Sequence, residues 1–209
     1  MARIFLVRHG KTEANSQLKY QGQTDTPLNS TGLKQAALLA KDLQKIHFNR
    51  IYTSNLKRAK KTAEVLAKPH RLKVRSLKDL AERNFGLWEN LTFKDIQKKY
   101  KNLYKQWLKS PAVKIPKAEM LSTFQKRILR GLKKILRSLK PAENILIVAH
   151  GGSNRIILSH FLKQDPAQSF WQIKQDNCCL NIIEIGNGYQ MVSLLNYYKE
   201  NLSQRSIKY

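Results

Sequence analysis

Short apolar runs alternate with helical patterns along most of the chain. The run at 4–7 has four consecutive apolar residues and the run at 145–149 has five, which is typical of strands buried on both faces. Between such runs, apolar residues recur at intervals of three and four, the spacing of an amphipathic helix. The pattern predicts strands at 4–7, 50–53, 145–149, 178–185 and 189–194, and helices at 33–43, 56–67, 92–100, 119–139 and 153–162.

These elements define the expected fold class. Fully apolar strands need cover on both faces, and strands that alternate with helices usually pair in parallel. The turn at 186–188 joins the last two strands as a hairpin. We therefore predict an α/β protein, a three-layer sandwich whose mainly parallel central sheet is flanked by helices. Because no repeat, low-complexity tract or Gly/Ser linker divides the 209 residues, a single domain over 1–209 is expected.

Composition bears on location and redox state. Apolar residues make up 42% of the chain, enough to build a core. No apolar run approaches the ~18 residues of a membrane span, and charges interrupt the first residues, so we expect a cytoplasmic protein with no membrane partner.

Cys178 and Cys179 are adjacent and are the only cysteines. This spacing favours reduced, structural thiols in a buried strand. The sequence carries no signal for an oligomeric state.

The chain is strongly basic, with 39 Lys and Arg against 14 Asp and Glu and a formal net charge of +25. A basic surface attracts phosphate polyanions, so one hypothesis is a nucleic-acid-binding protein. The basic residues are nevertheless spread along the whole chain. The densest group lies opposite the apolar stripe of the helix at 119–139: Lys126, Arg127, Arg130, Lys133, Lys134 and Arg137. We interpret it as a solvated helix face, and expect a general attraction for anionic ligands with no dedicated nucleic-acid binding.

Candidate chemistry gathers where the predicted strands end. In a parallel sheet, ligands bind beyond the carboxyl ends of the strands. Arg8 and His9 follow the first strand, Arg58 comes shortly after the second, and His150 and Gly151 follow the third. Guanidinium forks suit phosphate oxygens, and glycine lets backbone amides approach an anion closely. Two histidines and two arginines at one edge of the sheet therefore predict a phosphate-binding pocket.

Five sequence motifs contain these residues. R-H-G-x-T-x-x-N is found at 8–15, Q-G-x-x-D-x-P-L-x-x-x-G at 21–32, S-x-L-x-R-A-x-x-T-A at 54–63, L-x-E-x-x-F-G-x-W-E at 80–89 and V-x-H-G-G at 148–152. In this order the motifs resemble those of the histidine phosphatase superfamily, also called the phosphoglycerate mutase-like family. The resemblance covers most of the chain and implies the phosphoglycerate mutase-like fold.

The resemblance implies two catalytic residues. His9 would be the nucleophile that becomes a phosphohistidine. Glu82 would protonate the leaving alkoxide and later activate the water that hydrolyses the phosphohistidine. His9 must attack as a neutral imidazole, and the positive charges of Arg8 and Arg58 should lower its pKa.

The resemblance also implies groups that hold the substrate. A phosphoryl group in transfer needs its three equatorial oxygens held. The expected clamp consists of Arg8, Arg58 and His150, with Asn15 as a lesser donor, Gly151 at the phosphate, and Gln21 and Gly22 in a loop over the pocket. No closely spaced set of metal ligands is present, and the arginines would repel a cation. We expect neither a metal nor a cofactor.

These expectations favour a phosphomonoesterase of the histidine acid phosphatase type, acting on a small phosphorylated metabolite. The first alternative is a phosphoglycerate mutase, although 81–86 lacks the Arg-Arg pair that such mutases carry after the Glu block. The second alternative is a basic anion- or nucleic-acid-binding protein with an inactive pocket. The family often has G-G-E-S where this chain has K-A-E-M at 117–120, and W-E-G where it has W-E-N at 88–90. Because these segments differ from the family pattern, the sequence does not identify the metabolite.

Overall fold

The computed structural model describes residues 1–198, and within them six strands form one sheet in the order β3-β2-β4-β1-β5-β6. The first four strands along the chain are parallel to one another, whereas β5 runs antiparallel to β1 and β6 antiparallel to β5. The elements follow in this order: β1 (Ala2–Arg8), α1 (Glu13–Ser16), α2 (Ser30–Leu43), β2 (Arg50–Ser54), α3 (Lys57–Ala67), β3 (Val74–Leu77), α4 (Phe93–Lys99), α5 (Lys101–Lys109), α6 (Leu121–Leu136), β4 (Asn144–Ala149), α7 (Gly151–Phe161), α8 (Pro166–Ser169), β5 (Leu180–Ile185) and β6 (Gln190–Tyr197).

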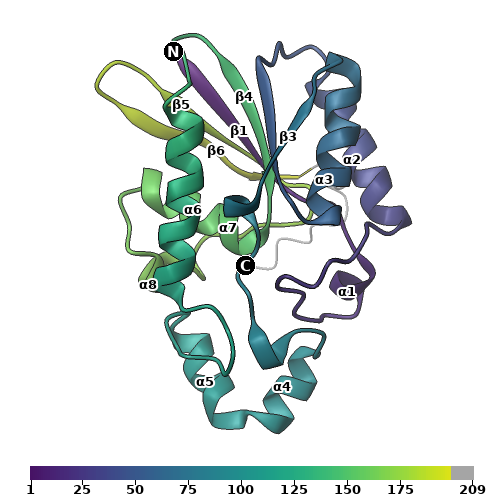
Figure 1. Cartoon of the computed structure of the whole chain (residues 1–209), viewed down its shortest axis with the longest axis vertical. Coiled ribbons are helices and arrows are strands. Elements are labelled where there is room, and N and C mark those ends of the chain that lie inside the picture. Colours follow the sequence, from purple (N-terminus) through teal and green to yellow (C-terminus); the bar gives the residue numbers. More distant parts are fainter. Residues whose placement is uncertain (199–209) are drawn as a thin grey trace, which may run out of the picture.

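Side chains of the central strands alternate between two cores, one on each face of the sheet. On β1, Ile4 and Leu6 pack beneath α6 and α7, whereas Phe5 and Val7 pack beneath α2 and α3. Figure 1 shows α6 on one side of the sheet and α2 and α3 on the other. Every residue of β4 is buried, as expected of a strand covered on both faces. The predicted three-layer sandwich with a mainly parallel sheet is therefore confirmed.

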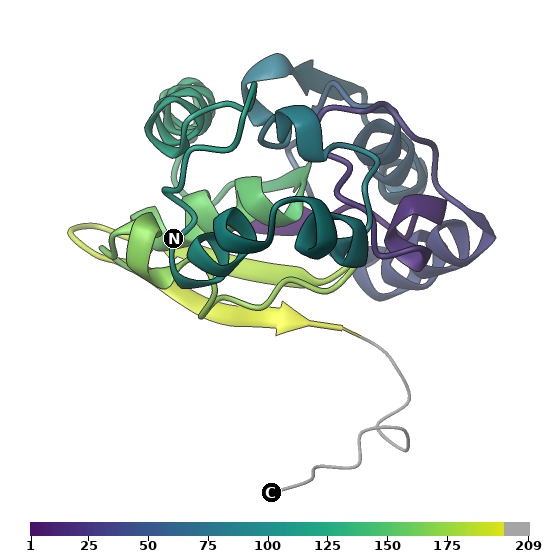
Figure 2. The same ribbon diagram turned by 90° about the horizontal axis from the view of Figure 1, so that it is seen from below.

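The segment between β3 and α6 forms a cap at the carboxyl end of the parallel strands. Its helices α4 and α5 lie at the lower end of the molecule in Figure 1, and Figure 2 shows them from below. Lys19 and Thr92 form an antiparallel bridge, which ties the cap to the loop after β1. The cap has a core of its own: Phe85, Trp88, Ile96, Trp107 and Ile115. It therefore provides one wall of a pocket at the strand ends.

The sequence pattern misses β3 and α5. Of the four residues of β3, only Val74 and Leu77 are apolar, and neither is fully buried because β3 lies at the edge of the sheet. The helix α5 starts directly after Tyr100, which ends α4, and has Leu103, Tyr104, Trp107 and Leu108 at helical spacing. The prediction ended the helix at 100 although this pattern continues, whereas β3 has no apolar periodicity that would indicate it.

Two predicted boundaries also shift. The helix expected from 153 begins at Gly151, because both glycines of the strand end belong to its first turn. The strand expected from Cys178 begins at Leu180, since Cys178 has a φ of 59° and cannot continue a strand. Within the described residues, no helix has the length and apolar character needed to cross a membrane.

The loop after β1 runs against the first turn of α2 with no space for a side chain. A Cβ atom on Gly32 would lie 2.1 Å from the carbonyl oxygen of Lys11, and one on Gly10 would lie 2.5 Å from the carbonyl oxygen of Gly32. The amide of Gly10 also donates a hydrogen bond of 3.1 Å to the hydroxyl of Thr62 in α3. These contacts fix the direction of the chain immediately after His9.

Gly32→Ala should therefore destabilise the protein by about 1–3 kcal/mol, although alanine is the better helix former. The added methyl group meets backbone atoms that cannot rotate away. Urea unfolding followed by circular dichroism measures the change. Lys34→Ala, at an exposed position of the same helix, is the control and should change stability by less than about 0.5 kcal/mol. Equal stability of the two variants would contradict the close backbone contact.

Candidate active site

A pocket at the carboxyl end of the sheet brings the predicted site residues together. Residues of the loop after β1, the start of α3, the segment after β3 and the start of α7 line it on one side, and the cap lines it on the other. All predicted residues except His150 line this pocket: Arg8, His9, Asn15, Gln21, Gly22, Arg58, Glu82 and Gly151. His150 lies behind His9, with the two ring centroids 5.1 Å apart.

His9 is 3% exposed, and its ring is held in one tautomer. Its Nδ1 lies 2.7 Å from the carbonyl oxygen of Gly10. Because a carbonyl oxygen only accepts, Nδ1 carries the proton and Nε2 keeps its lone pair in the neutral ring. Burial, and after it the charges of Arg58 and Arg8, hold the pKa of His9 well below its ordinary value. The ring is therefore a neutral base with a free nitrogen at physiological pH.

Arg8 and Arg58 are held by backbone carbonyls. Arg8 donates to the carbonyl of Gln175 at 2.6 Å, and Arg58 donates to the carbonyls of Gly22 and Thr24 at 2.7 Å each. The Nε atoms of both arginines are buried without a hydrogen-bond partner in the described part of the chain. Burial lowers the pKa of Arg58 to about 10, so it is still charged at neutral pH. Carbonyls orient these cations without neutralising them, which leaves their charge for an anionic ligand.

His150 is fully buried, and a hydroxyl holds one of its ring nitrogens. Its Nε2 lies 2.8 Å from the Oγ of Ser54 at the end of β2, while its Nδ1 has no partner among residues 1–198. Burial, followed by the charge of Arg58, holds the pKa of His150 well below its ordinary value. The structure therefore favours the neutral ring of His150.

Glu82 reaches the pocket from the segment that follows β3. Its Oε2 accepts a hydrogen bond of 2.9 Å from the amide of Gly152, and its Oε1 accepts one of 2.8 Å from the amide of Arg83. A Cβ atom on Gly152 would lie 2.3 Å from this carboxylate, so the second glycine of the motif makes room for Glu82. Two backbone amides therefore fix the direction of the carboxyl group.

Arg127 corrects the sequence interpretation of the basic helix. It was assigned to a solvated face, but its side chain is 15% exposed. It donates to the carbonyls of Asp79, Ala81 and Glu82 and pairs with the carboxylate of Glu119 at 2.7 Å. The carbonyl groups just before Glu82 are not paired in a sheet. The guanidinium of Arg127 donates the hydrogen bonds that they would otherwise lack. Arg127 is therefore part of the support of the pocket.

Asn15 is placed to donate to a ligand. Its Oδ1 accepts hydrogen bonds from the hydroxyl of Thr12 at 3.0 Å and from the side-chain amide of Asn177 at 3.2 Å. Its Nδ2 donates no bond within the described residues and lies at the pocket. A polar group with a fixed acceptor and a free donor suits an anion.

The loop at 21–24 is held by a carboxylate that sequence reasoning did not single out. The Oε1 of Glu89 accepts from the amides of Gln23 and Phe85, and its Oε2 accepts from the amide and hydroxyl of Thr24. Gly22 has a φ of +53°, and a Cβ atom there would lie 2.0 Å from Glu89. Gln21 is buried against the hydroxyl of Thr12. This loop braces Arg58 as well as lining the pocket.

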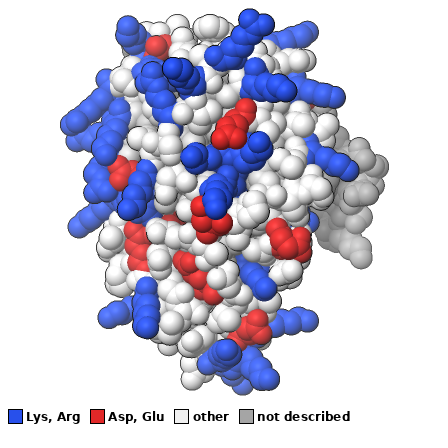
Figure 3. Space-filling model, turned by 45° about the vertical axis from the view of Figure 1, so that its right-hand side comes forward, with Lys and Arg blue, Asp and Glu red and all other residues white. Residues whose placement is uncertain are grey.

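Positive charge surrounds the site at two scales. Four cations and one carboxylate line the pocket: Arg8, Lys19, Arg58, Arg155 and Glu82. Figure 3 shows Lys and Arg spread over the visible face of the molecule, with no single stripe such as a nucleic-acid track would form. Among residues 1–198, no group of three or more His, Cys, Asp or Glu is placed to hold a metal ion.

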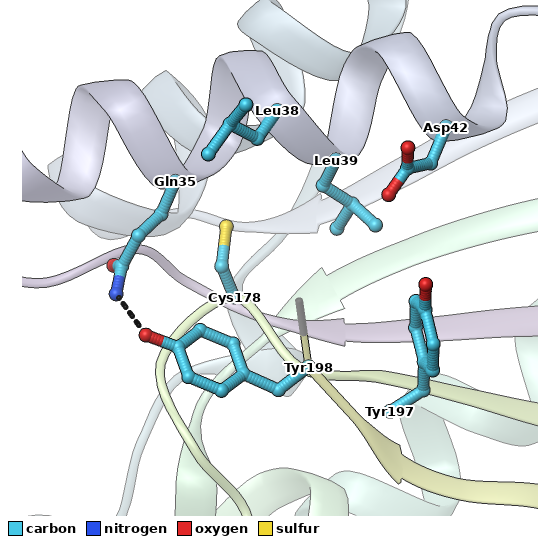
Figure 4. Close-up of a pocket in the computed structure, with 7 residues that line it drawn as sticks. All are labelled: Gln35, Leu38, Leu39, Asp42, Cys178, Tyr197 and Tyr198. Carbon is cyan, nitrogen blue, oxygen red and sulfur yellow. Dashed lines mark hydrogen bonds between the residues drawn. The ribbon is translucent and has the colours of Figure 1, made fainter. Parts of the chain in front are cut away.

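The two cysteines lie outside the site. Both are buried and free. Cys178 lies in a small depression between α2 and the end of β6, where Gln35 donates to the hydroxyl of Tyr198 at 3.2 Å (Figure 4). Burial raises the pKa of the Cys178 thiol to about 12 and that of Cys179 to about 11. The prediction of reduced thiols is consistent with this, although neither residue belongs to a strand.

The fold and the pocket together define an α/β protein with a pocket lined by positive charges at the ends of its parallel strands. The family model of the histidine phosphatase superfamily, branch 1, matches residues 4–197, and the chain belongs to this superfamily. The family resemblance predicted from the sequence motifs is confirmed.

Individual relatives agree with this assignment. The chain is 35% identical to the uncharacterized phosphatase PhoE of Bacillus subtilis, over 88% of this chain and 89% of PhoE. It is 30% identical to the probable phosphoglycerate mutase GpmB of Yersinia enterocolitica, over 88% and 85% of the two chains. The crystal structure of a putative α-ribazole-5'-P phosphatase from Escherichia coli superposes with a TM-score of 0.85 at 28% identity, over 94% of this chain and 96% of that one.

The buried neutral histidines should make stability depend on pH. Because the pKa of His9 is lower in the folded than in the unfolded chain, the unfolded chain binds more protons as the pH falls below about 6.5, and the free energy of unfolding decreases. In His9→Asn this decrease should be smaller by up to about 1.4 kcal/mol per pH unit. Urea unfolding between pH 7.5 and 5 in phosphate-free buffer measures the slope. His160→Asn, at an exposed position, should keep the wild-type slope. An unchanged slope in His9→Asn would contradict the neutral buried state.

Proposed function

We propose that the protein is a phosphomonoesterase that hydrolyses a small phosphorylated metabolite through a phosphohistidine on His9. The observation that carries the proposal is the state of His9: neutral, with Nδ1–H bound to the Gly10 carbonyl and Nε2 without a partner in a pocket that Arg8 and Arg58 also line. Such a nitrogen has an available lone pair directed into a site that attracts dianions. The phosphatase relative is consistent with the same chemistry.

In the first step, the lone pair of His9 Nε2 forms a bond to phosphorus while the bond from phosphorus to the ester oxygen breaks. The departing alkoxide takes a proton from the carboxylic acid of Glu82. The Gly10 carbonyl, which accepts from Nδ1–H, stabilises the positive charge that develops on the ring. The phosphoryl oxygens are held by the guanidinium groups of Arg8 and Arg58.

His150 and Asn15 complete the proposed clamp. In the proposed clamp the hydroxyl of Ser54, 2.8 Å from His150 Nε2, is the donor, which puts the proton of the neutral ring on Nδ1; this nitrogen has no partner in the described chain. That Nδ1–H donates to a phosphoryl oxygen, as does the free Nδ2 of Asn15. The amino-terminal end of α7, which begins at Gly151, adds the favourable end of its helix dipole.

In the second step, water attacks phosphorus, the carboxylate of Glu82 takes a proton from it, and the bond from phosphorus to His9 Nε2 breaks. Inorganic phosphate leaves and His9 returns to the neutral form. Guanidinium groups occupy the role that a divalent cation has in many phosphatases, so the proposed reaction requires no metal.

The mutase alternative is less well supported by the pocket. A mutase passes the phosphoryl group back to a bound acid, and the predicted difference was the lack of an Arg-Arg pair after Glu82. Arg83, the one arginine there, is 1% exposed and donates to the carbonyls of Pro111 and Glu119. It is therefore not free to bind a substrate. Release of inorganic phosphate in place of transfer to a second glycerate distinguishes the two reactions.

His9→Ala should lower turnover by more than about a thousandfold without loss of the fold, because it removes the nucleophile from a strand end. Protein quenched with detergent at alkaline pH after mixing with ³²P-labelled p-nitrophenyl phosphate should carry a phosphate that is stable in base and lost on acid treatment. His160→Ala is the matched control and should label like the wild type. Undiminished labelling of His9→Ala would refute the assignment.

Glu82→Gln should discriminate between leaving groups. An alkoxide must be protonated as it leaves, whereas nitrophenolate leaves without help. The rate constant of the pre-steady-state burst, which reports phosphoenzyme formation, should fall by about 10²- to 10⁴-fold with glycerol 3-phosphate. With p-nitrophenyl phosphate it should fall by less than about tenfold. Glu64→Gln, an exposed carboxylate on α3, is the control. Equal loss with both substrates would show that Glu82 is not the general acid.

A further inference from the structure

One cation of the pocket has no part in the proposed phosphate clamp. Arg155 extends from α7, and its Nε donates to the carbonyl of Ile173 at 2.8 Å. Its guanidinium carbon lies 5.1 Å from the ring centroid of Phe170 and 5.6 Å from that of Trp171. One hydrogen bond and two ring contacts hold this group in a fixed orientation.

The charge of Arg155 is not compensated within residues 1–198. It forms no ion pair there, and its two terminal nitrogens donate no hydrogen bond. Burial, and then the charge of Arg8, lower the pKa of Arg155 to about 10, so it is still charged at neutral pH. Arg155 is half-buried, so its charge is partly removed from water without an ion-pair partner, and a bound anion would offset that cost.

Arg155 lies beside the phosphate end of the pocket. A Cβ atom on Gly151 would lie 3.5 Å from the Nε of Arg8 and 3.7 Å from the Nη1 of Arg155, so the two guanidinium groups approach the same point from different sides. A group bound to Arg155 is therefore separated from the phosphate by only a few bonds. On the open side the pocket continues to Lys19 and the half-exposed Trp171.

The charges of the lining also exceed what one phosphate needs. Four cations and one carboxylate face the pocket while both histidines are held neutral. A phosphomonoester dianion, which Arg8 and Arg58 bind in the proposed clamp, and the Glu82 carboxylate together compensate three of the four positive charges. One positive charge is left over, and neither Arg155 nor Lys19 forms an ion pair within residues 1–198.

We propose that Arg155 binds a second acidic group on the alcohol part of the substrate, so that the preferred substrates are phosphomonoesters with a carboxylate or a further phosphate near the ester. The planar guanidinium can donate two parallel hydrogen bonds to a carboxylate or to a phosphate. This proposal rests on the phosphatase function and assigns a specificity-determining residue that the sequence motifs did not include.

Matched substrate pairs test the proposal. 3-Phosphoglycerate and glycerol 3-phosphate differ by a carboxylate in place of a hydroxymethyl group, and fructose 1,6-bisphosphate differs from fructose 6-phosphate by a second phosphate. The wild type should prefer the acidic member of at least one pair. Arg155→Gln should lower kcat/KM for that member about tenfold or more, and for its partner without the second acidic group less than about threefold. The pair that responds identifies carboxylate or phosphate as the second group.

Two further variants separate specificity from other effects. Arg155→Lys keeps the charge and should retain part of the preference, which also reports a correctly folded protein. Arg137→Gln removes an exposed arginine at the end of α6, and should leave the ratio within each pair unchanged if long-range attraction is not the cause. If Arg155→Gln lowered kcat/KM equally for both members of a pair, the proposal would be overturned. Arg155 would then serve the phosphate clamp or the stability of the fold.

Binding gives a second readout that does not need turnover. In the His9→Ala background, 3-phosphoglycerate should raise the midpoint of thermal unfolding more than glycerol 3-phosphate does, and the added Arg155→Gln substitution should remove the difference. If no phosphate is released from any ester, including p-nitrophenyl phosphate, the proposed function fails, yet this difference still decides the role of Arg155. No difference between the two compounds, together with none between the bisphosphate and fructose 6-phosphate, would refute it.

Discussion

Arg58 is buried and Arg8 half-buried beside His9, and both have backbone carbonyls, with no ion-pairing carboxylate, as their partners in the described chain. A carbonyl oxygen satisfies the hydrogen-bonding capacity of a guanidinium but does not cancel its charge. The positive potential therefore persists at the floor of the pocket. Burial lowers the pKa of His9 and of His150, and this potential lowers both further; it also favours an anion from outside the protein as the compensating charge. The choice of partner for two arginines thus determines both the reactivity of the histidine and the class of ligand.

This arrangement is costly to the fold. A buried charge without a counterion costs several kcal/mol, and the side chains around the pocket are held by hydrogen bonds in place of close apolar packing. The two cores of the sandwich offset that cost, because they are large and lie on either side of the same central strands. Binding of an anionic ligand offsets part of this free-energy cost, because a ligand that binds only the folded state stabilises that state. Free and occupied protein should therefore differ in stability.

The sequence predicted the layers and the strand ends well because both depend on local pattern. β1 and β4 are continuous apolar runs, and a parallel sheet necessarily collects the residues after them at one edge. It could not predict β3, whose edge position needs few apolar residues, nor the role of Arg127, which looks like any other solvated residue of a basic helix. Glu89 and Arg155 were missed for a related reason. Their importance comes from partners that are distant in sequence, such as Thr24 and Ile173, and no spacing rule connects them.

The carboxylate of Glu89 accepts hydrogen bonds from the loop at 21–24 and from Phe85 at the start of the cap, and the same loop supplies the carbonyls that orient Arg58. The cap has a separate aromatic core, which makes it a natural module to exchange when a new specificity is designed. A chimera that replaces the cap must nevertheless carry a carboxylate at position 89 together with a glycine at position 22. Without that pair the graft would change the cap and, at the same time, release Arg58 from the carbonyls that orient it.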